Sequence, residues 1–129
     1  MKYHWVVLIC FLFFCGCQNN TPVSGSYPTE GFASWYDPRF VTTGERYSQD
    51  GFTCAMRNRE FGKDYLICNR ENNKCVVARH NDFGPTLSLF KHGRIIDLSR
   101  HAFSKVAGLE KGIIKVRIGE IHSGLPIDN

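Results

Sequence analysis

Short strand-type segments separated by turn-forming residues dominate the chain between residues 30 and 121. The candidate strands are residues 31–36, 64–68, 74–79, 94–98 and 113–118. Residues 114–118 alternate apolar with basic side chains, which predicts one buried and one wet face. One helical segment accompanies them: Ser99 is a good N-cap, residues 102–107 carry an apolar face, and Gly108 is expected to supply a left-handed stop. This pattern predicts a small closed β-barrel, since a parallel α/β sheet needs more helices.

Two further segments lack strand or helix periodicity. Residues 41–47 are predicted to be mostly loop, and residues 53–57 a short apolar turn. An asparagine-rich turn is expected to join residues 64–68 to residues 74–79 as a hairpin.

The chain opens with features of an export signal. Lys2 precedes an apolar run from Trp5 to Cys15, which is shorter than the roughly 20 residues that span a bilayer. A basic start, a short apolar core and a small residue before the break are typical of a cleaved signal. We therefore expect a signal at residues 1–16, a flexible polar tether at 17–29, the domain at 30–121 and a short tail at 122–129.

The charge of the exported part is mildly positive. The chain has 16 Lys and Arg and 12 Asp and Glu, and removal of Lys2 leaves 15 against 12, or +3. There is no long basic run of the kind that follows a nucleic-acid backbone, so we expect no nucleic-acid partner. A small positive excess fits an anionic polymer as partner. Separately, we expect the protein to be a monomer.

Three cysteines lie within the predicted domain: Cys54, Cys68 and Cys75. Outside the cytoplasm, two of them can form a disulfide. Cys68 and Cys75 flank the asparagine-rich turn and face each other in one register. If the turn centres on residues 72–73, Cys75 lies opposite Arg70 instead, and Cys54 is the alternative partner. A zinc site is less favoured because no C-x-x-C pair is present.

Asp82 occupies a special place at the end of a predicted strand. The strand runs into Gly84-Pro85, a pair that cannot continue a β-ladder. Asp82 therefore sits where a rigid strand gives way to a loop, held from one side and open to a ligand on the other. The alternative is that it only caps the turn.

Five short motifs occur in a recognisable order. They are Gly-Phe-Ala-Ser-Trp-Tyr at 31–36, Thr-Gly-Glu at 43–45, Asn-Asp-Phe-Gly-Pro at 81–85, Asp-Leu-Ser at 97–99, and Gly112 with the strand Val-Arg-Ile at 116–118. Over residues 30–121 the chain resembles the rare lipoprotein A (RlpA) family of septal ring lytic transglycosylases. The resemblance implies a mainly β fold, a six-stranded double-psi β-barrel with one or two short helices, related to expansins and barwin.

The start of the chain adds a second resemblance. Gly16-Cys17 is similar to the lipobox of bacterial lipoproteins, in which the cysteine is acylated and becomes the new N-terminus. The alternative is ordinary signal cleavage without a lipid. Gln18 is not the Asp that commonly signals inner-membrane retention, so the resemblance implies a lipid anchor at Cys17 in the outer membrane, facing the periplasm.

The family implies an activity and a set of site residues. Its members act on peptidoglycan and include lytic transglycosylases that cut glycan strands lacking stem peptides. By position, Asp82 matches the family's catalytic acid and Glu45 its Gly-Glu acid, while Trp35 and Tyr36 match its aromatic motif. The chain departs from the family at Met56, where a functionally important His is usual, and at residue 83, where Arg is common and Phe stands here.

A lytic transglycosylase needs little catalytic machinery. The sugar's own C6 hydroxyl attacks the anomeric carbon to form a 1,6-anhydro end, and a tethered attacker can replace a dedicated nucleophile. One carboxyl group, which we assign to Asp82, can protonate the leaving oxygen and later take up the hydroxyl proton. Glu45 is expected either to position sugar hydroxyls and stabilise charge or simply to anchor its loop. His80, two residues from Asp82 and on the same strand face, is a candidate to replace the missing His. The alternative is a structural role, which is the more common one for a single histidine on a strand.

Five further residues are candidates whose roles have alternatives. Trp35 and Tyr36 point to opposite strand faces, so one is expected to stack on a sugar and the other to join the core. Arg94, with Arg79, either binds the lactyl carboxylates of peptide-free strands or is a solvated charge. Asp97 is expected to satisfy backbone donors before the helix.

No cofactor or metal is expected, because the spacing of the histidines and acids is not distinctive. The sequence therefore supports a peptidoglycan transglycosylase first. A non-catalytic glycan-binding module is the second hypothesis, and a structural envelope protein the third.

Overall fold

The computed structural model describes residues 27–121. The predicted signal, the lipidation site Cys17, most of the tether and the tail at 122–129 lie outside the described residues, so those expectations stay predictions. Among the residues described, no helix has the length and apolar character needed to cross a membrane.

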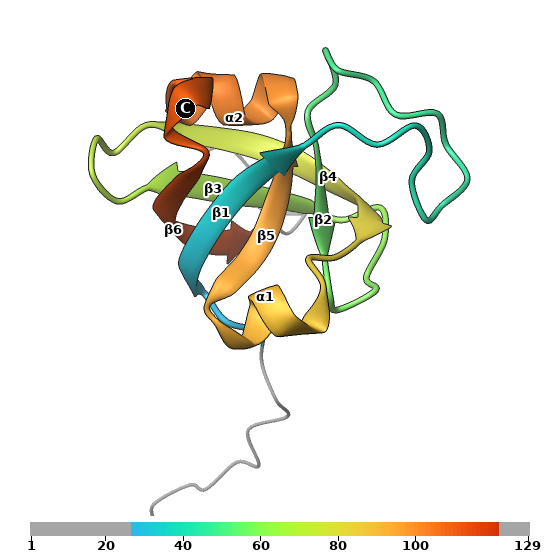
Figure 1. The fold of residues 1–129 in the computed structure, drawn as a ribbon, viewed down its shortest axis with the longest axis horizontal. Helices are drawn as coiled ribbons and strands as arrows, with labels where there is room; N and C mark the ends of the chain where they lie inside the picture. Colours follow the sequence, from blue (N-terminus) through green and yellow to red (C-terminus); the bar gives the residue numbers. More distant parts are fainter. Residues whose placement is uncertain (1–26, 122–129) are drawn as a thin grey trace, which may run out of the picture.

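Six strands close into a barrel, flanked by two short helices (Figure 1). The elements are β1 Glu30–Tyr36, β2 Thr53–Met56, β3 Asp64–Asn69, β4 Cys75–Phe83, α1 Leu87–Lys91, β5 Arg94–Ser99, α2 Arg100–Val106, a 3-10 turn at Leu109–Lys111, and β6 Ile113–Glu120. Around the barrel the order is β1-β5-β2-β4-β3-β6. The β1–β5 and β2–β4 pairs are parallel, and the other four pairs are antiparallel. The predicted six-stranded barrel is confirmed.

Two local predictions are wrong. Residues 53–57 were predicted as a turn, but Thr53–Met56 form β2, a central strand between β4 and β5. Three of its four residues are buried, so it shows no alternation that a sequence pattern could detect. Ser99 is the N-cap of α2 as predicted and accepts from the Ala102 N–H at 3.3 Å, but Gly108 is not a left-handed stop, since its φ is −65°.

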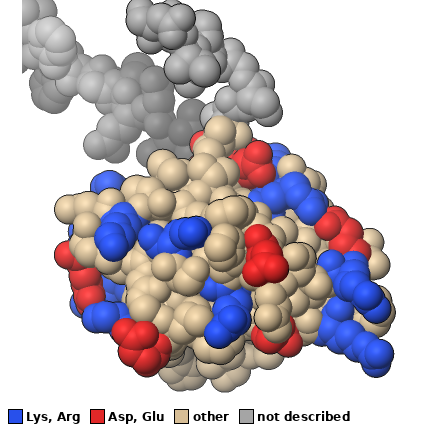
Figure 2. All heavy atoms as spheres, turned by 90° about the horizontal axis from the view of Figure 1, so that it is seen from above, with Lys and Arg blue, Asp and Glu red and all other residues tan. Residues whose placement is uncertain are grey.

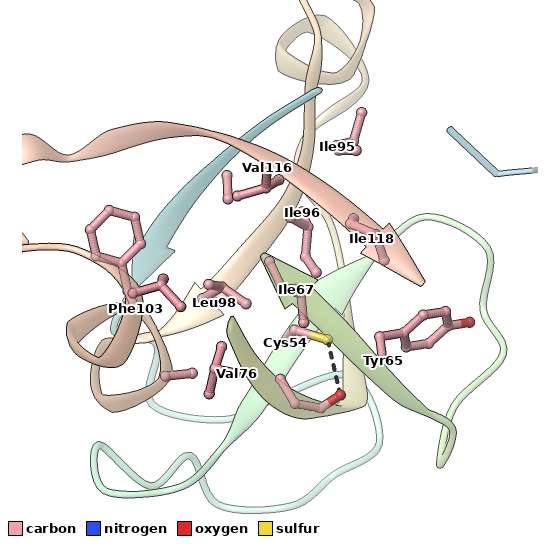
Figure 3. Packing of buried hydrophobic residues seen from close by; sticks show 14 of the residues in the cluster. Cys54, Tyr65, Ile67, Val76, Ile95, Ile96, Leu98, Phe103, Val116 and Ile118 are labelled. Carbon is pink, nitrogen blue, oxygen red and sulfur yellow. Dashed lines mark hydrogen bonds between the residues drawn. The ribbon is translucent and has the colours of Figure 1, made fainter. Parts of the chain in front are cut away.

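The core fills the barrel with branched aliphatic side chains. Ile67, Ile96 and Val116 meet inside it (Figure 3), each at most 1% exposed. α2, whose Phe103 is fully buried, lies at one end of the barrel, and α1 lies at the other end (Figure 1). Burial of this apolar surface is the main stabilising term for a domain of this size.

The segment before β1 also packs on the barrel. The Tyr27 hydroxyl donates to the Ile95 carbonyl and accepts from the Arg57 N–H, and its ring lies 5.7 Å from that of Phe90. The last residues of the predicted tether therefore belong to the folded domain.

The hairpin register decides between the two disulfide pairings left open by the sequence. Cys68 lies opposite Cys75 in the β3–β4 ladder, and the two form a disulfide. The turn between them is wider than two residues, because Asn69 N donates to the Lys74 carbonyl and Asn73 adopts a φ of 59°. Cys54 is a free thiol in the core, and burial raises its pKa.

Surface charges of both signs mix on the face seen in Figure 2. Basic and acidic side chains alternate across it and form no stripe of one sign. Recognition of a partner on this face therefore depends on individual charges rather than on a broad electrostatic field.

Candidate active site

A β-bulge near the end of β4 determines which side chains face outward. In the parallel β2–β4 ladder, Cys54 pairs with His80, but the next pair is Ala55 with Asp82. Asn81 is the extra residue, so His80 and Asp82 no longer share a strand face. The prediction that they do is wrong.

His80 belongs to the core rather than to a substrate site. Its side chain is 0% exposed, and its Nε2 lies 2.8 Å from the Asp82 carbonyl and 3.2 Å from the Met56 carbonyl. Burial lowers the pKa of His80, which favours the neutral ring. His80 therefore holds the backbone of the bulge and is not available to bind a glycan.

Asp82 is fixed by three hydrogen bonds to a single oxygen. Its Oδ1 accepts from the Thr42 N–H at 2.8 Å, the Thr42 hydroxyl at 2.6 Å and the Phe83 N–H at 2.8 Å. The side chain stays partly exposed. Asp82 thus caps the loop and also faces solvent, so the two interpretations of the sequence hold together.

Glu45 lies on the same loop and is paired with an arginine. Arg79 donates to its two oxygens at 3.0 and 2.7 Å, and the Thr43 hydroxyl donates at 3.2 Å. The hydrogen bonds from Arg79 are the main reason that the pKa of Glu45 falls from 4.5 to about 2. Glu45 is therefore a fixed negative charge at neutral pH rather than a proton donor.

One loop brings the two predicted acids to neighbouring positions along β4. Thr42 binds Asp82, the Thr43 N–H donates to the Asn81 carbonyl at 3.4 Å, and Glu45 binds Arg79. Both carboxylates therefore sit where the loop at residues 41–45 docks on β4. The same docking makes Arg79 a partner of Glu45 rather than a free charge.

The aromatic pair divides between the site and the core. Trp35 packs against the core and donates its indole N–H to the Leu109 carbonyl at 3.1 Å. The hydroxyl of Tyr36 is buried and has no hydrogen-bond partner among residues 27–121. Burial, followed by the nearby charge of Asp82, raises the pKa of Tyr36 far above its usual value. Tyr36 is thus the aromatic residue that lies beside the candidate acid.

Asp97 is the site residue that sequence reasoning undervalued. It pairs with Ala55 in the β2–β5 ladder, and Ala55 pairs with Asp82 on its other side. Laterally paired residues share a sheet face, so two carboxylates flank one small side chain. A Cβ built on Gly84 would lie 3.7 Å from the Ala55 Cβ and 3.9 Å from Asp97 Oδ2, so the chain after β4 passes close over this place.

The environment of Asp97 differs from that of Asp82. Asp97 is only 7% exposed, and the Arg94 Nε lies 2.6 Å from its Oδ1. Burial raises its pKa, Arg94 opposes this, and the charge of Asp82 adds to the rise. The partner of Asp97 is therefore Arg94, not the backbone donors that were expected, and Arg94 is not a solvated charge.

Met56, which replaces the family's His, points into the core. Its side chain is 0% exposed and belongs to the hydrophobic cluster. A side chain in this place cannot reach a bound sugar. Within residues 27–121, no group of three or more His, Cys, Asp or Glu side chains is placed to hold a metal ion.

Comparison with known proteins identifies the family of this barrel. A family model described as lytic transglycolase matches residues 29–118. The chain belongs to the RlpA-like double-psi β-barrel family. Endolytic peptidoglycan transglycosylase RlpA of Haemophilus influenzae is 37% identical over 113 residues, which cover 81% of this chain and 38% of that protein. The Campylobacter jejuni protein of the same name is 35% identical over 108 residues, covering 81% of this chain and 38% of that protein. The chain therefore spans about two fifths of the length of these relatives.

Solved structures share the fold at lower identity. An expansin of Clavibacter michiganensis has a TM-score of 0.57 at 16% identity and covers 75% of this chain and 52% of its own. The Streptomyces papain inhibitor has a TM-score of 0.53 at 20% identity and covers 73% of this chain and 94% of its own. Proteins with names this different share one barrel, so function must be argued from the site.

Proposed function

We propose that this RlpA-like domain is a lytic transglycosylase, a lyase that cuts peptidoglycan glycan strands lacking stem peptides and leaves 1,6-anhydro ends. The observation that supports this most is the set of hydrogen bonds that fixes the side chain of Asp82. Three donors occupy its Oδ1, so exchange of a proton with a substrate falls to Oδ2. The names of the curated relatives point to the same activity.

The chemistry needs one carboxyl group in two successive roles. Protonated Asp82 gives its proton to the glycosidic oxygen as the bond from that oxygen to C1 breaks. The C6 hydroxyl of the same sugar then attacks C1, and its proton passes to the Asp82 carboxylate. No water is consumed, and the acid is regenerated. The attacker is part of the substrate, so the second catalytic carboxylate of ordinary glycosidases is not required.

The neighbouring groups stabilise the charge that develops during this step. C1 becomes positive as its bond breaks, and fixed negative charge nearby stabilises it. Glu45, with a pKa of about 2, is ionised at neutral pH, and Asp97 lies on the other side of Ala55 from Asp82. Each carboxylate is paired with an arginine, Glu45 with Arg79 and Asp97 with Arg94, which offsets part of its negative charge.

The test is the formation of anhydro ends from peptide-free strands, read by mass spectrometry. We expect product from the wild-type protein and a loss of at least roughly 10²-fold in Asp82→Asn, because a positioned acid–base group contributes 10²–10⁴-fold. Asp50→Asn, at an exposed position of the loop before β2, is the matched control and should keep the wild-type rate.

Burial of Met56 in place of the family's His favours a second candidate, a module that binds glycan without cutting it. Strand binding by both wild-type protein and Asp82→Asn, with anhydro product from neither, would replace the enzyme by this binder.

We further propose that the domain is anchored by acyl chains on Cys17 in the outer membrane, facing the periplasm. The support is the lipobox-like Gly16-Cys17 and the absence of Asp at position 18. Metabolic labelling with a fatty acid should mark the wild-type protein and not Cys17→Ala. Equal labelling of the two would refute the anchor.

A further inference from the structure

Two arginine side chains gather on the ring of Phe83, the residue that follows Asp82. The Arg59 Cζ lies 4.0 Å and the Arg57 Cζ 4.7 Å from the ring centroid. Arg57 also donates to the Pro85 carbonyl at 2.8 Å. The face of an aromatic ring attracts guanidinium groups. Phe83 therefore holds two positive charges next to the candidate acid.

Neither arginine has a carboxylate partner within residues 27–121. The two arginines that the sequence suggested for sugar carboxylates do have one, since Arg79 pairs with Glu45 and Arg94 with Asp97. Among the contacts that the structure describes, between residues 27 and 121, Arg57 and Arg59 are the two of these four arginines that keep an uncompensated charge for a ligand.

The strand register places this pair beside the catalytic site. Met56 pairs with Phe83 one step after Ala55 pairs with Asp82, and Arg57 directly follows Met56. Two residues along a strand cover about 6.6 Å. Arg57 is two residues beyond Ala55, so its backbone lies no more than about 7 Å from that of the residue that pairs with Asp82.

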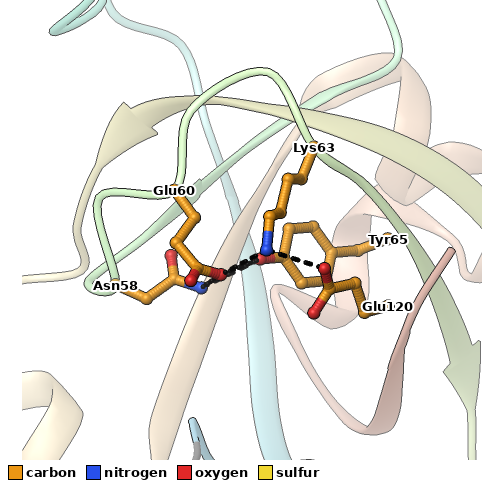
Figure 4. Close-up of polar contacts among 5 residues, drawn as sticks. All are labelled: Asn58, Glu60, Lys63, Tyr65 and Glu120. Atoms are coloured by element: carbon orange, nitrogen blue, oxygen red, sulfur yellow. Dashed lines mark hydrogen bonds and ion pairs between the residues drawn. The ribbon is translucent and has the colours of Figure 1, made fainter. Parts of the chain in front are cut away.

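The loop that carries Arg59 is fixed to the barrel. Lys63 Nζ lies 3.2 Å from Glu60 and 2.7 Å from Glu120 of β6, and Asn58 donates to the Tyr65 hydroxyl at 2.9 Å (Figure 4). Arg59 itself has a φ of 53°, a left-handed conformation that is uncommon for residues with a side chain. Such conformations concentrate at ligand sites, where the surrounding contacts hold them in place.

We propose that Arg57 and Arg59, positioned by Phe83, form an anion subsite that binds the lactyl carboxylate of an N-acetylmuramic acid residue. This inference rests on the proposed function. Planar guanidinium groups suit a planar carboxylate. In a strand that bears stem peptides this carboxyl group is an uncharged amide, so the subsite favours strands without peptides by charge alone.

The test measures binding in an Asp82→Asn background, which prevents turnover. The ligands are peptide-free strands and a chitooligosaccharide of equal length, which has no lactyl group. Arg57→Gln and Arg59→Gln should each weaken binding to the strands by about tenfold, the equivalent of roughly 1.4 kcal/mol for a lost charged hydrogen bond. Binding to the chitooligosaccharide should change less than twofold. The control for net charge is Arg117→Gln, which should match the background for both ligands. Arg117 is exposed on β6 and forms no ion pair with any other residue of the described part of the chain.

The outcomes separate this subsite from the proposed function. If the glutamine variants bind the strands as tightly as the background, or lose both ligands equally, the anion subsite is wrong while the activity at Asp82 stands. If the background protein binds no strands at all, the subsite and the proposed function both fall. Arg59 lies on the exposed loop surface, so Arg59→Gln keeps the test valid even if Arg57→Gln fails to fold.

Discussion

The hydroxyl of Thr42 gives a direct way to test whether the hydrogen bonds that fix Asp82 matter for activity. It donates to Asp82 Oδ1 at 2.6 Å and accepts from the Phe83 N–H at 3.1 Å. Thr42→Val removes both bonds and preserves the branched shape of the side chain. The Thr42 and Phe83 N–H groups still bind Oδ1, so Asp82 is loosened rather than released.

The expected size of the effect follows from these contacts. A hydrogen bond to a charged group contributes about 1.5–3 kcal/mol, and Thr42 is exposed, so water fills the gap and the lower value applies. About 1.5 kcal/mol corresponds to roughly tenfold in rate. We therefore expect kcat for anhydro-end formation to fall about tenfold with little change in KM, well short of the loss in Asp82→Asn.

The matched control is Thr86→Val. Thr86 is the N-cap residue of α1, is exposed, and makes no side-chain capping bond. Both variants are assayed at 25 °C after their Tm values are measured, because a loss of about 1 kcal/mol shifts Tm by only 4–8 °C in a domain of this size. A wild-type kcat in Thr42→Val, or an equal fall in Thr86→Val, would contradict the assignment of Asp82.

Three other substitutions test the site and the stability of the barrel that carries it. The Glu45–Arg79 pair should stabilise the fold by no more than about 1 kcal/mol, because both side chains are 42% exposed. The pKa of Glu45 is lower in the folded state, so this contribution to stability is complete above pH 4.5 and disappears as the pH falls towards 2. The free energies of unfolding of wild type and Glu45→Gln, measured by urea titration, should therefore become equal as the pH falls from 4.5 to 2. Gly84→Ala adds a methyl group at contact distance from Ala55 and Asp97, so KM for the strands should rise with Tm unchanged, and an unaltered KM would place the substrate elsewhere. Cys68→Ala/Cys75→Ala should lower the free energy of unfolding by about 2–3 kcal/mol, the value for a closed loop of this length, while kcat stays near wild type because the hairpin turn is outside the site.

The strands that the sequence revealed are those with enough residues to show a pattern. β6 is the clearest, since Ile114, Val116 and Ile118 are buried while Lys115 and Arg117 are exposed, as the alternation predicted. β2 has four residues, three of them buried, and α1 has five residues with none fully buried. Neither length covers enough periods for a pattern to emerge. Short elements of this kind depend on their neighbours, which the sequence does not provide.

The residues of the site also differ in whether local sequence could reveal them. Asp82 was recognisable because Gly-Pro follows it closely, and Glu45 because of its motif, since both signals are local. The partners of these acids are not local: Thr42 is 40 residues from Asp82 and Glu45 is 34 residues from Arg79. The role of Asp97 required the register of β2 against two strands, and β2 itself was not predicted. The sequence therefore predicted the role of a residue where that role depends on its neighbours in the chain, and did not where it depends on distant partners.

The bulge at Asn81 explains why His80 has a structural role and does not replace the missing family histidine. In a regular strand His80 and Asp82 share a face, and a histidine beside the acid would replace the missing family residue. One extra residue turns His80 into the core, where its ring binds the carbonyl of Asp82 instead of reaching its carboxylate. Since Met56 is also buried, no imidazole at either position can reach a sugar at Asp82. Any rate that the domain achieves at Asp82 must then come from the carboxyl group of Asp82 and the substrate's own C6 hydroxyl, without help from an imidazole. The pH profile of kcat should therefore show no change near pH 6.5, about the pKa of an ordinary histidine. If kcat does change near that pH, and still does so in His92→Asn and His101→Asn, a histidine reaches the site after all.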